Sequence, residues 1–176
     1  MTTSLVMTAI GPDRPGLVKL LSDAAERYGA NWAESRMASL AGQFAGMVHF
    51  EVAAENAEPL EAALRELQDA GLRIVIARSG GPHAAVASRK VNLELVGHDR
   101  PGIVRELSEA LAANGVSIDE LHTQVASAAM SGGHLFKVKA RLAVPQSLSD
   151  GKLKAALESL TNEMMVDLEL GSDASR

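Results

Sequence analysis

An eight-residue stretch occurs twice in this sequence. Residues 11–18 (GPDRPGLV) return as residues 97–104 (GHDRPGIV), at a shift of 97 − 11 = 86 residues in a chain of 176. Each copy follows a short apolar run and precedes a segment with apolar residues at helical spacing. A repeat at this interval predicts two structural units of roughly 80 to 90 residues each.

The repeated stretch lies where a predicted strand gives way to a predicted helix. The first N–H groups of a helix have no partner within it, that end is electropositive, and a glycine there lets a ligand approach the backbone. We therefore expect each copy to form a pocket for a small anion such as the carboxylate of an amino acid. The alternative is that Asp-Arg-Pro-Gly only starts the helix, because Pro is favoured at the first helical position. Two copies at matching places favour a functional role.

The first half of the sequence predicts the order strand, helix, strand, strand, helix, strand. Gly29 and Gly71 stand where the helices are expected to end, and Pro59 stands where the second helix is expected to begin. Right-handed crossovers turn this order into a four-stranded antiparallel sheet with both helices on one face. The expected strands are residues 4–10, 31–40, 43–53 and 72–77, with a tight hairpin turn at Ala41-Gly42.

The second half predicts the same order of elements. Its first helix carries apolar residues at helical spacing from Ile103 to Leu111 and ends at Gly115. The fold class is therefore α+β, with two ferredoxin-like βαββαβ units. The expected strands are residues 90–96, 116–128, 134–144 and 165–170, with a hairpin around residues 130–133.

The register of the repeat predicts one insertion in the second half. Phe136 follows Phe50 by 86 residues, and Pro145 follows Pro59 by the same interval, whereas Leu153 of the last helix follows Leu60 by 93 residues. We therefore expect seven additional residues around Pro145 to Lys152. The expected organisation is a first domain at residues 1–78, a linker rich in Gly, Ser and Ala at 79–88, a second domain at 89–171 and a frayed polar tail at 172–176.

Composition restricts the function classes. The net charge is −5 and no basic patch stands out, which disfavours direct binding to nucleic acid. The chain has no cysteine, so it has neither disulfides nor a thiolate nucleophile, and its five histidines lack the spacing of metal ligands on a helix. The sequence shows no set of residues that could act together as nucleophile, base and orienting group. We therefore expect a protein that is not an enzyme and that binds neither a metal nor a cofactor. No leader or membrane-spanning run is evident, and we expect a cytoplasmic protein that does not contact membranes.

With two βαββαβ units that each open on Asp-Arg-Pro-Gly, the sequence resembles a tandem pair of ACT domains. These are small ferredoxin-like modules that bind amino acids and regulate whatever they are joined to. The resemblance covers roughly residues 3–78 and 89–171 and leaves no catalytic or DNA-binding domain over. A stand-alone double module of this length is similar to the glycine cleavage system transcriptional repressor group, whose members act as accessory regulators.

The resemblance also implies a ligand site. In the family the ligand lies where the first loop of one module meets the start of the second strand of a neighbouring module. The family often has Asn at that strand; the first unit keeps it and the second has Ser, which offers one hydroxyl in place of an amide. The implied ligand-binding residues are Gly11, Pro12, Asp13, Arg14, Pro15, Gly16 and Asn31, with Gly97, His98, Asp99, Arg100, Pro101, Gly102 and Ser117.

Individual residues of these loops allow two interpretations. Asp13 and Asp99 either receive a ligand ammonium group or stabilise the helix start. Arg14 and Arg100 either pair with a ligand carboxylate or, as we expect, lie solvated over the helix. The sequence does not decide between these roles of the aspartates.

Two functions remain from the sequence. The first is a regulator that binds a small amino acid, by resemblance glycine, and thereby changes its affinity for a protein partner such as a DNA-binding regulator. The alternative is a ligand-free interaction module that pairs through a sheet edge or a sheet face. Self-association, as a homodimer, is expected under both, because a single sheet exposes one face and two edges. Whether modules pair within a chain or between chains is left open.

Overall fold

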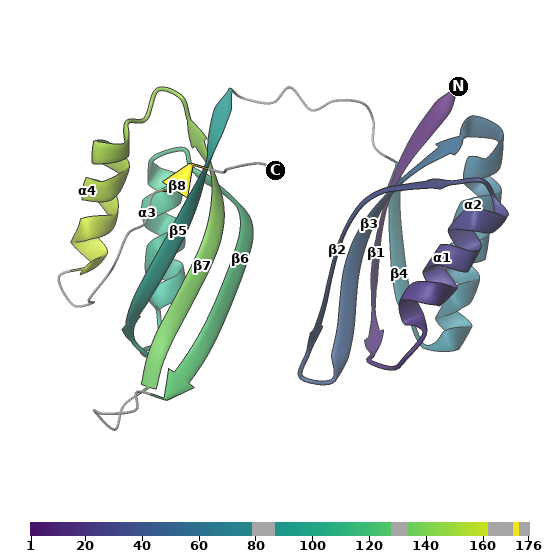
Figure 1. Cartoon of the computed structure of the whole chain (residues 1–176), viewed down its shortest axis with the longest axis horizontal. Coiled ribbons are helices and arrows are strands. Elements are labelled where there is room, and N and C mark those ends of the chain that lie inside the picture. Colours follow the sequence, from purple (N-terminus) through teal and green to yellow (C-terminus); the bar gives the residue numbers. More distant parts are fainter. Residues whose placement is uncertain (79–86, 128–133, 162–170, 173–176) are drawn as a thin grey trace. The chain divides into compact units, whose positions relative to one another are not determined.

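The computed structural model describes residues 1–78, 87–127, 134–161 and 171–172. The chain divides into two compact units, Met1–His83 and Ala84–Arg176. In each unit the helices lie on one face of an antiparallel sheet (Figure 1). The predicted α+β fold with two ferredoxin-like units is confirmed. No helix in the described ranges is long and apolar enough to cross a membrane.

Unit 1 has the predicted order of elements. Its sheet has the strand order β2-β3-β1-β4, which places the first and third strands in the centre. The tight turn predicted at Ala41-Gly42 is confirmed, with φ of 51° and 76° at its two residues. The elements are β1 (Thr2–Pro12), α1 (Leu17–Arg27), β2 (Asn31–Leu40), β3 (Gln43–Ala53), α2 (Ala54–Glu66), the short 3-10 helix η1 (Leu67–Ala70) and β4 (Arg73–Arg78).

The core of unit 1 lies between the sheet and its two helices. Every second residue of β1 and β3 points toward the helices, as the alternation of apolar residues predicts. The helices bury one apolar stripe each against this face. The other face of the sheet carries no helix of unit 1 (Figure 1). The largest fully buried side chains of this core are Phe50, Leu5, Met7, Leu21, Leu60, Leu64 and Leu72.

The start of the second helix differs from the prediction. Pro59 does not begin α2 but lies inside it, five residues after Ala54. The apolar stripe of α2 extends back to Ala57, which is 1 % exposed, so burial favours helix on both sides of the proline. Gly71 ends η1 with a φ of 83°, a left-handed conformation that favours glycine.

Unit 2 has the strand order β6-β7-β5-β8. β5 begins at Ser88, which the sequence analysis placed at the end of the linker. Gly171 and Ser172 form β8 and pair with Asn92 and Val91, so the frayed tail predicted from residue 172 is wrong for Ser172. The strand predicted at 165–170 and the hairpin residues 130–133 lie outside the described residues. The elements are β5 (Ser88–His98), α3 (Ile103–Ala113), β6 (Ser117–Ser127), β7 (His134–Pro145), α4 (Asp150–Thr161) and β8 (Gly171–Ser172).

The register of the third strand of the repeat also differs from the prediction. Phe44 pairs with Gly11, and Phe136 pairs with Gly97, so Phe136 corresponds to Phe44 and not to Phe50. Residues of β7 thus follow their equivalents in β3 by 136 − 44 = 92 positions. Residues of β5 and β6 follow their equivalents in β1 and β2 by 86 positions. Six additional residues, 92 − 86, therefore lie in the hairpin between β6 and β7. The last helix follows its equivalent by 93 positions, so only one additional residue, 93 − 92, lies between β7 and α4. Pro145 corresponds to Ala53 and ends β7.

Candidate functional site

The two repeated loops begin their helices in the same way. Gly16 precedes α1 with a φ of 94°, and Gly102 precedes α3 with a φ of 96°. Each glycine carbonyl accepts the first helical hydrogen bond, from Leu20 N at 3.0 Å and from Glu106 N at 2.9 Å. The prolines of the motif precede these glycines and are not the first helical residues. The motif thus precedes the helix in both units, but its proline is not the first helical residue.

The aspartates of the loops contact the hairpins between the second and third strands. Asp13 N donates to the carbonyl oxygen of Gly42 at 2.9 Å, and Asp13 Oδ2 accepts a hydrogen bond from Ser39 Oγ at 2.5 Å. Asp99 N donates in the same way to the carbonyl oxygen of His134 at 2.9 Å. No side chain caps α1 or α3. These aspartates therefore form no capping hydrogen bond at the helix start, and their interaction with the helix dipole stays a prediction.

The arginines of the loops are held by groups of the chain itself. Arg14 Nη2 donates to the carbonyl oxygen of Ala70 at 2.7 Å, which fastens the loop to the end of η1. Arg100 forms two hydrogen bonds with Glu106, at 2.8 and 2.6 Å, and these lower the pKa of that carboxyl group. Unit 1 has Leu20 at the position of Glu106, so Arg14 finds a backbone acceptor instead. Arg14 is nevertheless exposed, as expected, whereas Arg100 is half-buried beside Glu106 and departs from the expectation that both arginines lie solvated.

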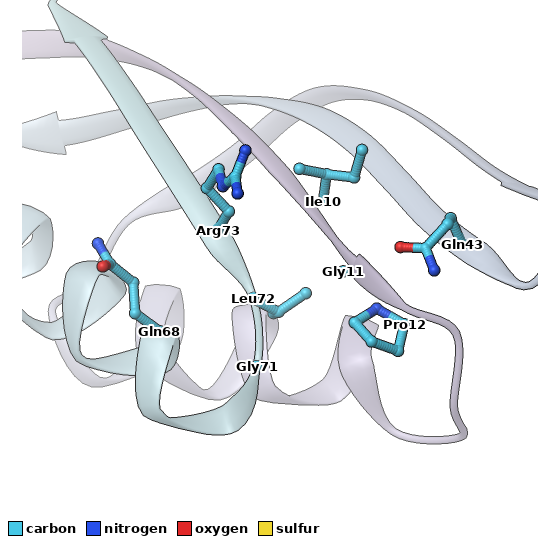
Figure 2. A pocket seen from close by; sticks show the side chains of 8 residues that line it. All are labelled: Ile10, Gly11, Pro12, Gln43, Gln68, Gly71, Leu72 and Arg73. Atoms are coloured by element: carbon cyan, nitrogen blue, oxygen red, sulfur yellow. The ribbon is translucent and has the colours of Figure 1, made fainter.

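A pocket of about 460 Å³ lies where β1 ends and β4 begins (Figure 2). Its floor depends on a close approach of two glycines, because a Cβ atom at Gly11 would lie 2.4 Å from the carbonyl oxygen of Gly71. The Arg14 hydrogen bond holds the same turn in place from the other side of Gly71. The pocket is lined by Ile10, Gly11, Pro12, Gln43, Gln68, Gly71, Leu72 and Arg73.

Three polar side chains of this pocket are absent from the predicted site. Arg73, Gln43 and Gln68 are among its lining residues (Figure 2). No carboxylate of the described residues forms an ion pair with Arg73. A signal for Arg73 was available in the sequence. It follows the helix-ending glycine and begins a strand predicted to run beside β1, and it pairs with Ile10 in the structure.

The structure brings only part of the predicted site together. Gly11 and Pro12 line the pocket, whereas Asp13, Arg14, Pro15 and Gly16 form the adjoining loop without lining it. Asn31 lies at the other end of the sheet. Glu51 of β3 pairs with Asn31 on one side and with Ser4 of β1 on the other. Ser4 precedes Gly11 by seven residues, which corresponds to about 23 Å along β1.

Unit 2 repeats this separation. Ser117 is aligned through Ala143 with Lys90, which again precedes Gly97 by seven residues. Within neither unit does the start of the second strand reach the first loop. The loop of unit 2 comprises Asp99, Arg100, Pro101 and Gly102, and follows Gly97 and His98 at the end of β5. Among the described residues, no three acidic or histidine side chains are grouped so as to hold a metal ion.

A family model for the ACT domain matches the chain twice, at residues 3–77 and 91–171. The chain belongs to the ACT-domain family. The two matches coincide with the two units of the structure and together span most of the 176 residues. ACT domains are typically regulatory modules that bind amino acids.

Two solved structures resemble this tandem ACT protein over nearly its whole length. One, named only as an unknown protein from Galdieria sulphuraria, is 32 % identical, covers 98 % of this chain and 99 % of its own, and superposes with a TM-score of 0.86. The other, described as a "putative glycine cleavage system transcriptional repressor", is 20 % identical with the same coverages and a TM-score of 0.72. At that identity the second structure supports the fold alone. No protein with a curated description matches the chain.

Proposed function

We propose that this protein is a non-enzymatic regulator that binds a small amino acid such as glycine and thereby modulates a protein partner. The observation that carries the proposal is the pocket beside Gly11, which is lined by Arg73, a cation with no ion-pair partner among the described residues. Its position at the first loop agrees with what the resemblance to ACT domains implies. The description of one structural neighbour as a "putative glycine cleavage system transcriptional repressor" makes glycine the first ligand to test.

The pocket offers the groups that an amino acid requires. The Arg73 guanidinium forms paired hydrogen bonds with the ligand carboxylate, the geometry that arginine favours. The amide oxygens of Gln43 and Gln68 accept hydrogen bonds from the ligand ammonium group. The side chains of Ile10, Pro12 and Leu72 surround the rest of a small ligand. A volume of about 460 Å³ admits an amino acid with room for water.

Calorimetric titration with glycine, serine and alanine tests this proposal. Saturable binding of one of them to the wild-type protein is expected, and the Arg73→Gln variant should bind at least tenfold more weakly. Arg27→Gln is the matched control, because Arg27 is a cation in the last turn of α1 that does not line the pocket. An absence of heat and of thermal stabilisation with every amino acid contradicts the proposal. Equal affinity of wild type and Arg73→Gln places the ligand elsewhere.

The acidic chain acts through a protein in this proposal, and not by contacting DNA. A net charge of −5 gives no phosphate-binding surface. A partner such as a DNA-binding regulator would respond to the amino acid only to the extent that the ligand binds the free and complexed forms with different affinities. Retention of the isolated protein on DNA at physiological salt would contradict this part of the proposal.

A further inference from the structure

The face of the unit 1 sheet that points away from its helices, called the open face, carries a group of apolar side chains arranged around Thr8. Val6 and Ile10 flank Thr8 along β1, and Met47 and Val75 pair with it directly from β3 and β4. Their exposed fractions are 36 %, 43 %, 50 % and 64 %. These four residues and Thr8 are called the Thr8 patch below. Four of the large exposed hydrophobic residues in the described chain thus lie side by side on one sheet face.

Unit 2 has charged or polar residues at three of the five equivalent positions. Glu94 corresponds to Thr8, Lys139 to Met47 and Asn92 to Val6, whereas Val96 corresponds to Ile10, and the position equivalent to Val75 lies outside the described residues. Glu94 and Lys139 form an ion pair at 2.7 Å. Two further pairs, Glu120 with Arg141 and Lys90 with Asp119, lie on the same face. The centre of this face is therefore charged in unit 2, and an apolar centre is not a requirement of the fold.

We propose that the Thr8 patch is the dimer interface of this protein and that its occupant is the same patch of a second copy. The Thr8 patch placed against a surface that carries ion pairs would desolvate those pairs without compensation. The same face placed against its own copy buries apolar surface on both sides. The inference concerns the partner surface and holds whichever amino acid the protein binds.

The size of the face suits a homodimer. Four strands about 4.8 Å apart and 6 to 11 residues long at about 3.3 Å per residue give a face of roughly 600 Å² in projection. Stable interfaces bury about 800 Å² per partner. Polar residues surround the patch, with Arg73 at one corner and an ion pair of Glu34 with Arg36 at 2.8 Å on the outer strand. An apolar centre with a polar rim is the usual anatomy of an interface.

The shape of the face also allows it to pair with itself. A hollow of about 320 Å³ lies beside β3, and Val6 and Met47 are among its lining residues. A two-fold axis that runs parallel to β1 and lies between the two faces above Thr8 places β4 of one copy over β3 of the other, since β3 and β4 flank β1 on opposite sides. Val75, the most exposed residue of the patch, then lies over Met47 of the other copy, because both residues pair with Thr8. The contact forms twice, as two-fold symmetry requires.

Sedimentation equilibrium of the full chain tests the proposal. The wild-type protein should have twice its monomer mass of 18.5 kDa. The double variant Thr8→Glu/Met47→Lys places the residues of the Glu94–Lys139 pair at the equivalent positions of unit 1, so the sheet is expected to fold. Its dissociation constant should rise at least tenfold. Val18→Lys is the matched control, because Val18 is an exposed apolar residue on α1, away from the open face.

A second measurement locates the interface directly. The chain contains no cysteine, so Thr8→Cys introduces a single thiol at the centre of the patch. A short bis-maleimide should cross-link this variant into dimers, and Val18→Cys should give far less product. A wild-type monomer at 100 µM, a double variant that dimerises as tightly as wild type, or dissociation by Val18→Lys alone would each overturn the proposal. Circular dichroism of every variant verifies that it is folded.

Discussion

Gly11 and Gly71 come so close that a side chain on Gly11 does not fit between β1 and the turn that precedes β4. A Cβ atom added to Gly11 would lie 2.4 Å from the carbonyl oxygen of Gly71. The repeated motif thus begins with a glycine because the backbone of another segment occupies the space of a side chain. This contact forms the floor of the candidate pocket, so the geometry of the site depends on it.

Gly11→Ala is expected to destabilise unit 1 by about 1–3 kcal/mol, since the new methyl group meets rigid backbone. Trp32 is the only tryptophan of the chain and packs edge-on against Phe50 at 5.3 Å, so its fluorescence reports unfolding of unit 1. Urea titration followed by this signal measures the change. Gly46→Ala is the control: its Cβ would meet the flexible side chain of Met37 at 2.8 Å, and the loss should be smaller. A Gly11→Ala loss no larger than this would contradict the assigned role.

Glu61 is the one buried charged residue among those described, with 8 % exposure, and it anchors the last strand of unit 1. Arg78 Nε donates to Glu61 Oε1 at 2.7 Å and Arg65 Nη2 donates to Glu61 Oε2 at 3.0 Å. The hydrogen bond from Arg78 is the main cause that lowers the pKa of Glu61 below its ordinary value of 4.5. A carboxylate with a lowered pKa stabilises the folded state above pH 4.5, and this contribution is lost as the pH falls below that value.

Glu61→Gln should therefore lower the free energy of unfolding by about 1–3 kcal/mol at pH 7, because charge-assisted hydrogen bonds are lost. The difference from wild type should shrink as the pH falls from 4.5 toward 3. Urea titrations with Trp32 fluorescence at several pH values give this dependence. Glu109→Gln removes an exposed pair with Arg105 and should change little at any pH. A difference between wild type and Glu61→Gln that is constant with pH would show that its ionisation is not involved.

The sequence predicted those features that local chemistry determines. The bounds of β2 and β3 are correct because a strong turn separates them, and Gly29 and Gly115 end their helices in left-handed conformations because few other residues adopt them. The helix around Pro59 was predicted too short because burial of Ala57 favours helix beyond a proline that propensity alone would place first.

Long-range features of the site escaped prediction for a different reason. The partners of Arg14 and Arg100 are decided by which acceptor the fold places nearby, Ala70 in one unit and Glu106 in the other. Identical tetrapeptides thus have different contacts. Arg73 was not predicted as a pocket residue because its proximity to Gly11 arises only when β4 pairs with β1.

The register error has its own physical cause. Side chains alternate with a period of two along a strand, so a shift of six residues keeps every apolar residue of β7 on the same face. Phe136 therefore matched Phe50 in the sequence although it corresponds to Phe44. The hydrogen bonds of the loops decide the correct alignment. Asp13 N bonds to Gly42, Asp99 N bonds to His134, and 134 − 42 is again 92.

This alignment predicts that the longer hairpin of unit 2 can be shortened without damage. Residues 127–134 occupy the place of Ala41-Gly42, because the pair Ala126–Leu135 corresponds to Leu40–Gln43. Replacing residues 127–134 by Ala-Gly keeps the carbonyl group that Asp99 N requires. Closing a loop of two residues instead of the six between Ser127 and His134 costs about 1 kcal/mol less, so unit 2 should become more stable by about that amount.

Urea titration followed by far-UV circular dichroism measures the change, since Trp32 fluorescence reports unit 1 alone. Deleting residues 146–151, where the sequence pattern placed the insertion, is the control. It removes the carbonyl group of Leu148, which accepts a hydrogen bond from Arg89 at 3.1 Å, and the first residue of α4, Asp150, which pairs with Arg89. This deletion should unfold unit 2. Loss of unit 2 in the shortened hairpin and its survival in the second deletion would show that the insertion lies before α4, and that the alignment through Phe44 and Phe136 is wrong.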